Sequence, residues 1–148
     1  MFRATKDIVL PTTITGSLPR PSWYTQNLGM RSFLDAMVNN QFREQYVDTV
    51  GIYLHEQEMA GLDIVTDGEI RREGFIFHIA GQWEGVDCVN LGVKERYRNR
   101  VQPRPVPRIT GKIVRRGAAA VEDTRFARKH TNLPLKMQVP GPMTVVDS

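Results

Sequence analysis

Cysteine is nearly absent from this chain of 148 residues: Cys88 is the only one, so an intramolecular disulfide framework is excluded. The sequence also lacks any apolar run close to the ~20 residues of a membrane-spanning helix, and its first residues do not have the pattern of a secretory signal. With 41% hydrophobic and 24% charged residues, the composition is that of an ordinary folded protein. We therefore expect a soluble, cytoplasmic protein that makes no membrane contact.

Acidic residues are scarce in one segment, which accounts for much of the formal net charge of +4. Between residues 94 and 116 the single acid, Glu95, stands against nine basic residues: Lys94, Arg96, Arg98, Arg100, Arg104, Arg108, Lys112, Arg115 and Arg116. Such a segment attracts anions. We interpret it as a solvated, hairpin-like excursion at about 83–116 whose charges discourage further sheet pairing, with an anionic small ligand as the alternative. Nucleic acid is not the expected partner, because interleaved aromatic residues are missing apart from Tyr97.

Three short β-prone segments each end in a polar or glycine-bearing loop. They cover residues 12–15, 62–65 and 135–139, and they are followed by the loops 16–21, 67–72 and 140–144. In α/β proteins the carboxyl ends of parallel strands carry the active site. We therefore expect the chemistry of this chain in these loops.

Helical periodicity fills the intervals between the three segments. Residues 40–60 contain no proline and carry an apolar stripe, and Gly61 provides a left-handed stop; the stripe comprises Phe42, Tyr46, Val50, Tyr53, Leu54 and Met59. A weaker helix is predicted over 118–129, with an inward face of Ala118, Val121, Phe126 and Ala127. The alternation of strand and helix predicts an α/β fold with a parallel sheet.

The length leaves room for only three core strands. A closed (β/α)₈ barrel typically needs about 250 residues, and this chain has 148. A doubly wound sheet is compatible with this size, whereas an unfinished barrel would leave an open sheet edge with unpaired backbone groups.

Five motifs in this order and spacing resemble the catalytic domain of cobalamin-independent methionine synthases and their shorter relatives. They are TTITGSLP at 12–19, QEMAGLDIV at 57–65, DGEIRR at 67–72, PRITG at 107–111 and VPGPMT at 139–144. The resemblance covers nearly the whole chain but only the first part of that domain. It implies that residues 1–148 are one partial domain, the N-terminal portion of a TIM-type (β/α)₈ barrel with about three βα units.

The function implied by the resemblance is methyl transfer from a methyl-folate to homocysteine, with zinc converting the substrate thiol to the nucleophilic thiolate. A chain that holds part of the barrel would be active only with the remaining barrel half, either a separate chain or a second copy. Two alternatives remain. The chain is a non-catalytic binding or assembly fragment of the same fold, or it belongs to an alkyltransferase that acts on another thiol.

The resemblance also assigns substrate-binding residues. Gly16 and Ser17 would hold the amino-acid part of the thiol substrate, next to Thr15, which stands where the family usually has an aliphatic residue. Glu69 would bind the substrate ammonium by a charge-assisted hydrogen bond, with Asp67 as a further contact. The structural alternatives are a turn cap for Ser17 and an ion pair with one of the two following arginines for Glu69.

No catalytic residue and no metal ligand is assigned to this chain. The family's zinc ligands, a histidine, two cysteines and a glutamate, come from strands later than the third, and their motifs are absent here. The histidines and the cysteine that are present have no companion at zinc spacing: His55, His78, Cys88 and His130. We therefore expect zinc to be held elsewhere, with methyl-folate as a possible co-substrate.

Overall fold

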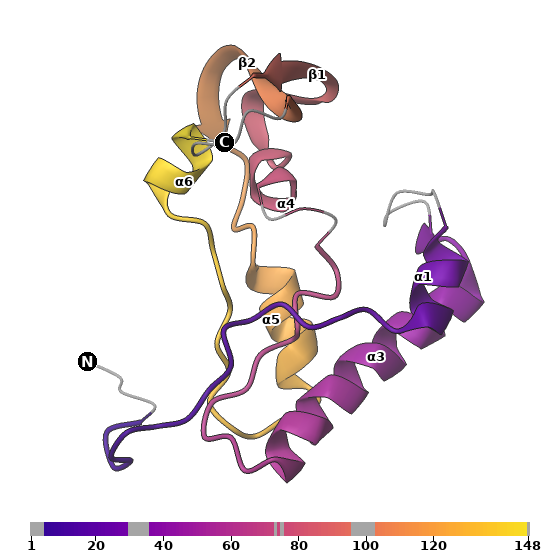
Figure 1. Cartoon of the computed structure of the whole chain (residues 1–148), viewed down its shortest axis with the longest axis vertical. Coiled ribbons are helices and arrows are strands. Elements are labelled where there is room, and N and C mark those ends of the chain that lie inside the picture. Colours follow the sequence, from indigo (N-terminus) through magenta and orange to yellow (C-terminus); the bar gives the residue numbers. More distant parts are fainter. Residues whose placement is uncertain (1–4, 30–35, 73, 75, 96–102, 148) are drawn as a thin grey trace. The chain divides into compact units, whose positions relative to one another are not determined.

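The computed structural model describes residues 5–29, 36–72, 74, 76–95 and 103–147 (Figure 1). Its helices are α1 (Ser22–Leu28), α3 (Asn40–Met59), α4 (Phe77–Ala80), α5 (Val121–Arg128) and α6 (Pro142–Val146), and its strands are β1 (Trp83–Lys94) and β2 (Arg104–Arg115). The chain forms two compact units. Unit 1 comprises Met1–Arg71 and Ala120–Gln138, and unit 2 comprises Arg72–Ala119 and Val139–Ser148. The predicted α/β class is confirmed.

Within unit 1, the three segments predicted as strands lie side by side and run parallel. Thr13 bridges Ile64, and Val65 bridges Leu135. The main-chain N–H of Ile64 donates to the Thr12 carbonyl at 3.1 Å, while that of Val65 donates to the Pro134 carbonyl at 3.0 Å on the other side. The middle segment is therefore the one at residues 63–66, flanked by residues 12–15 and 134–138. These contacts are isolated bridges rather than long strands.

Helix α3 forms where the sequence predicts it, because local signals define both ends. The Asn39 side chain caps the first turn by accepting from the Phe42 N–H at 3.0 Å. At the other end Gly61 has a φ of 76°, and the N–H of Leu62 reaches back to the Gln57 carbonyl at 3.1 Å. This pattern of a left-handed glycine and a six-residue hydrogen-bonded turn is a Schellman motif.

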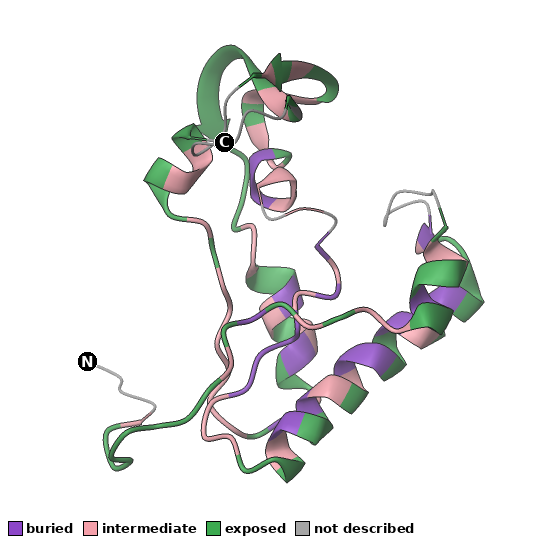
Figure 2. Ribbon diagram, viewed as in Figure 1, coloured by how far each residue is buried: buried purple, intermediate pink, exposed green. Residues whose placement is uncertain are grey.

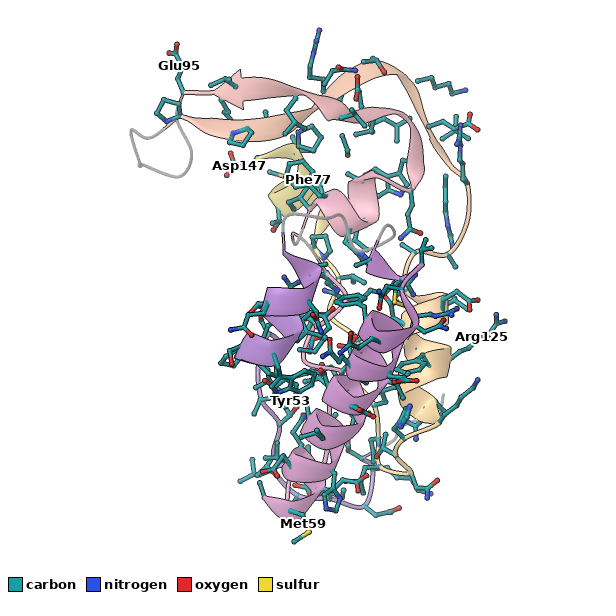
Figure 3. All side chains as sticks on the ribbon, turned by 90° about the vertical axis from the view of Figure 1, so that its right-hand side faces the viewer. Tyr53, Met59, Phe77, Glu95, Arg125 and Asp147 are labelled. Atoms are coloured by element: carbon teal, nitrogen blue, oxygen red, sulfur yellow. The ribbon has the colours of Figure 1, made fainter. Side chains whose placement is uncertain are left out.

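One side of α3 is buried and the other is exposed (Figure 2). The buried side includes Phe42, Tyr46, Val50 and Leu54, as predicted. Met59 was assigned wrongly to this side: it is 73% exposed and projects from the end of α3 (Figure 3). Because each residue turns the helix by about 100°, Met59 lies roughly 140° from Leu54, and the buried position of this last turn is Gln57.

Aromatic packing joins α3 to its neighbours in unit 1. Tyr24 of α1 contacts Phe42 with ring centroids 5.1 Å apart, and Phe126 of α5 stacks on Tyr46 at 5.0 Å. The buried core cluster comprises Tyr24, Ala36, Phe42, Tyr46, Val50, Leu54, Val65, Ile70 and Ala127. Burial of this set packs the helices against the middle parallel segment, which contributes Val65.

Helix α5 is shorter than the predicted range of 118–129 and presents a different face. Ala127 is buried as predicted, but Val121 is 38% exposed and Asp123 is buried in its place. The buried carboxylate is stabilised by an ion pair with Arg71 at 2.7 Å. A periodicity of apolar residues cannot identify such a position.

Unit 2 contains an antiparallel hairpin of β1 and β2, with Trp83 opposite Arg115 and Lys94 opposite Arg104. Gly85 has a φ of 76°, and a Cβ at this position would lie 2.4 Å from the Lys112 carbonyl oxygen, so the register shift here requires glycine. Part of the basic segment, residues 96–102, lies outside the described residues. None of the helices described is long and apolar enough to cross a membrane.

Candidate functional site

The candidate site consists of two turns at the carboxyl ends of adjacent parallel segments in unit 1. The first turn follows residues 12–15 and carries Gly16 and Ser17. The second follows residues 63–66 and carries Asp67 and Glu69. The main-chain N–H of Leu18 donates to the Gly68 carbonyl at 3.0 Å, which joins the two turns directly. The residues predicted to bind substrate therefore lie on neighbouring turns at one edge of the segments.

The second turn has an unusual backbone. Gly68 and Glu69 both have positive φ, at 70° and 56°. A Cβ at Gly68 would lie 3.2 Å from a methyl carbon of Leu18, so the turns pack closely. The buried Asp67 stabilises the turn because its Oδ1 accepts from the Glu69 N–H at 3.1 Å. A non-glycine residue held at positive φ is uncommon and often marks a functional site.

The first turn is packed against a side chain from the third segment. Gly16 is buried, and a Cβ there would lie 2.6 Å from Cδ of Gln138. The Gln138 carboxamide donates to the Thr15 carbonyl at 2.9 Å and accepts from the Thr66 hydroxyl at 3.0 Å. Ser17 is exposed and so accessible to a ligand. Sequence reasoning missed Gln138, although its place at the end of the third predicted strand is a usable signal.

A second glutamine fixes the end of the middle segment to α3. The Gln57 carboxamide donates to the Thr66 carbonyl at 2.8 Å and accepts from the Thr66 N–H at 2.9 Å. Both residues are buried. One side chain of α3 thus hydrogen-bonds both the N–H and the carbonyl of Thr66. It thereby holds the residue that precedes the second turn against the helix.

An ion pair anchors the far end of the second turn. Arg71 donates to Asp123 of α5 at 2.7 Å, and Asp123 is only 3% exposed. Nearby, burial raises the pKa of the Tyr46 hydroxyl, and the negative charge of Asp123 raises it further. Tyr46 therefore stays neutral, and Arg71 connects the turn to helix α5.

The described residues do not fit a zinc centre. No group of three or more His, Cys, Asp and Glu side chains among them is placed to hold a metal ion. Cys88 lies in β1 of unit 2, where burial raises the pKa of its thiol and the charge of Asp87 raises it further. A thiol in such surroundings is not activated as a nucleophile. We therefore derive no reaction step through zinc in this chain.

The described hollows in unit 1 do not coincide with the two turns. One of about 490 Å³ lies beside the start of the third segment and is lined by Glu58, Lys129, His130, Thr131, Asn132 and Leu133. It is located at the amino end of that segment, whereas the two turns lie at the carboxyl ends.

Known proteins resemble this chain over most of its length. A methionine synthase of Sulfolobus acidocaldarius is 30% identical over 142 residues, which is 93% of this chain and 39% of that protein. A 5-methyltetrahydropteroyltriglutamate–homocysteine methyltransferase of Serratia proteamaculans is 30% identical over 138 residues, with 92% of this chain and 18% of that protein aligned. The chain thus spans well under half of the length of these relatives.

A solved structure is also similar to this chain over most of its length. A B12-independent methionine synthase from Shewanella sp. W3-18-1, in complex with selenomethionine, superposes with a TM-score of 0.75 at 32% sequence identity; 93% of this chain and 40% of that chain are covered. The family described as the catalytic domain of cobalamin-independent synthases matches residues 10–148. Because this match includes both turns and nearly all of the sequence, the chain belongs to the cobalamin-independent synthase catalytic-domain family.

Proposed function

We propose that this chain supplies the substrate-binding turns of a zinc-dependent thiol methyltransferase that transfers a methyl group from a methyl-folate to homocysteine. The hydrogen bond between Leu18 and Gly68 carries the proposal, because it brings the two turns together at one edge. The relatives support the reaction type, since they include methionine synthases and a homocysteine methyltransferase. The three parallel segments support an assignment to the first three βα units of a (β/α)₈ barrel.

In this proposal the two turns together bind the amino-acid end of the substrate, one at its carboxylate and the other at its ammonium group. The exposed hydroxyl of Ser17 and the main chain of Thr15 and Gly16 contact its carboxylate end. Glu69 binds its ammonium group through a charge-assisted hydrogen bond, which is stronger than a neutral one. Asp67, whose Oδ1 accepts from the Glu69 N–H, holds Glu69 in its left-handed conformation. The chain thus binds and orients the substrate.

Chemistry at the thiol is assigned to the rest of the barrel. Zinc bound there would supply the thiolate form of the substrate. The part of the chain that the structure describes has no fitting set of ligands. We therefore propose that the partner is the remaining barrel half, which contributes the metal site and the surface for the methyl-folate.

The same two joined turns are compatible with a second candidate function, which needs no metal site. In this alternative the chain is a non-catalytic fragment that binds an amino-acid thiol or only assembles. The residue Thr15, in place of the family's usual aliphatic residue, favours a further variant in which the accepted thiol is not homocysteine.

A complementation assay tests these functions. The chain is mixed with the portion of the Sulfolobus relative that follows the aligned segment, and methyl transfer from a methyltetrahydropteroyl-triglutamate to homocysteine is measured with and without zinc. We expect activity only with both polypeptides and zinc, and a loss of at least tenfold for Glu69→Gln, since a charge-assisted bond is worth about 1.5–3 kcal/mol. Glu56→Gln, on the exposed side of α3, is the matched control. Homocysteine binding without methyl transfer would favour the non-catalytic alternative.

A further inference from the structure

We propose that Gln138 is a positioning residue of the substrate site, and that Gly16 lacks a side chain so that the Gln138 carboxamide can hold the first turn against the second. This inference deepens the proposed function and rests on it. It assigns a role to a residue that lies on neither turn and that hydrogen-bonds the residue preceding each of them.

The Gln138 side chain crosses the middle segment. It begins on the third segment, meets the Thr66 hydroxyl at 3.0 Å on the second, and ends at the Thr15 carbonyl at 2.9 Å on the first. Thr66 immediately precedes the Asp67 turn, and Thr15 immediately precedes the Gly16 turn. One carboxamide therefore sets the distance between the starting points of both turns.

The conformation of this carboxamide depends on the absence of a side chain at Gly16. A Cβ built there would lie 2.6 Å from Cδ, 2.8 Å from Nε2 and 2.9 Å from Cγ of Gln138. Real Cβ atoms do not approach so closely, so an alanine at this position would displace the amide. Displacement would break both hydrogen bonds at once. Gly16 also has no positive φ that would require glycine for backbone reasons.

Lys136 supports the same arrangement. It lies two residues before Gln138, so the two side chains occupy the same face of the segment. Its ammonium group donates to the Ile14 carbonyl, one residue before the carbonyl that Gln138 binds. Two side chains on one face of the third segment thus bind successive carbonyls of the first. The third segment therefore holds the main chain of the first segment up to Thr15, the residue that precedes Gly16.

A double-mutant cycle on homocysteine affinity tests the proposal in the complemented assembly. Gln138→Ala and Gly16→Ala are each expected to raise the Kd about tenfold, because each releases the first turn. The double variant is expected to bind no more weakly than either single variant, since both changes remove the same contact. Gln41→Ala, on the exposed side of α3, is the matched control and should leave the Kd unchanged.

Affinity is measured well below each variant's unfolding midpoint, so that a purely structural role would leave the Kd unaffected. Losses that multiply to about a hundredfold in the double variant would show independent effects and would overturn the inference. An unchanged Kd for Gln138→Ala would overturn it as well, while leaving the proposed function intact. Failure of the wild-type assembly to bind homocysteine would instead overturn the proposed function, and this inference with it.

Discussion

At the scale of single residues, two glutamine side chains replace the hydrogen bonds that a longer sheet would supply. Gln57 pairs with both main-chain groups of Thr66, and Gln138 binds the Thr15 carbonyl and the Thr66 hydroxyl. The three segments share only isolated bridges, and the Gln138 amide adds a connection between them, whereas the Gln57 amide attaches the middle segment to α3. The geometry of the candidate site therefore depends on polar residues beside it.

The first prediction concerns Gln57→Leu. Leucine has a volume similar to that of glutamine but carries no carboxamide. The buried N–H and carbonyl of Thr66 therefore lose their hydrogen-bond partners. We expect a loss of about 2–4 kcal/mol in the free energy of unfolding, measured by urea denaturation, because each unsatisfied buried group costs about 1–3 kcal/mol. Gln41→Leu on the exposed side of the same helix is the control and should change stability by less than about 0.5 kcal/mol. Equal effects of the two substitutions would contradict this role.

The second prediction concerns pH. The Asp63 carboxylate accepts from the Thr12 N–H and hydroxyl, both at 2.8 Å, and these bonds hold its pKa below the ordinary value of 3.8. A carboxyl group whose pKa is lowered by folding stabilises the protein at pH values above its ordinary pKa. This stabilisation is lost as the pH falls through the pKa of the folded state. Thr12→Val should therefore destabilise the chain at pH 7, and the difference from the wild type should shrink below about pH 4.

Thermal unfolding of both proteins between pH 2.5 and 7 measures that difference. Thr110→Val, an exposed substitution in β2, should show no pH-dependent difference from the wild type. A Thr12→Val difference that stays constant across this range would mean that Asp63 does not depend on the Thr12 hydroxyl.

At the scale of elements, helix α3 organises unit 1, and its ends are determined by its own sequence. Asn39 begins it and Gly61 ends it, so the predicted range of 40–60 agrees with the observed Asn40–Met59. Helix α5 was predicted less well. Its inward face depends on Asp123, whose partner Arg71 is 52 residues away in the sequence. Local periodicity reveals apolar faces and caps, but not a buried ion pair between distant segments.

The third prediction compares two glycines associated with α3. Gly51 lies inside the helix, and a Cβ there would make an ordinary 3.5 Å contact with His130. Gly51→Ala should stabilise the chain by about 1 kcal/mol through helix propensity. Gly61 has a φ of 76° and open space around it, so Gly61→Ala should destabilise the chain by about 1 kcal/mol through backbone strain alone. Urea denaturation of the two variants measures both shifts, and shifts of the same sign would contradict the assignment.

At the scale of the whole molecule, the chain has two compact units and spans about 40% of its structural relative. The sequence was sufficient to predict the family and the α/β class, because each depends on contiguous motifs, while the substrate-binding role of the loops at 16–21 and 67–72 stays a prediction. It did not predict Gln57 and Gln138, whose partners become neighbours only when the parallel segments associate. The positive φ of Glu69 was not predicted either, because glutamate seldom adopts this backbone conformation.

The fourth prediction concerns assembly. Size-exclusion chromatography with light scattering should show that the chain alone self-associates or unfolds without cooperativity, because the outer parallel segments lack further strands in the described part of the chain. Addition of the remaining barrel half should give a defined one-to-one complex. A stable monomer of 16.9 kDa with cooperative unfolding would contradict the need for a partner.

The central claim is that the turns at Gly16 and Glu69 bind the amino-acid end of a thiol substrate. Calorimetric titration of homocysteine into the complemented assembly, with the wild type and with Glu69→Gln, tests it most directly. The account predicts a Kd that rises by at least tenfold in Glu69→Gln at unchanged assembly mass, because the charge-assisted bond to the ammonium group is lost. Equal affinity of the two proteins would contradict the claim.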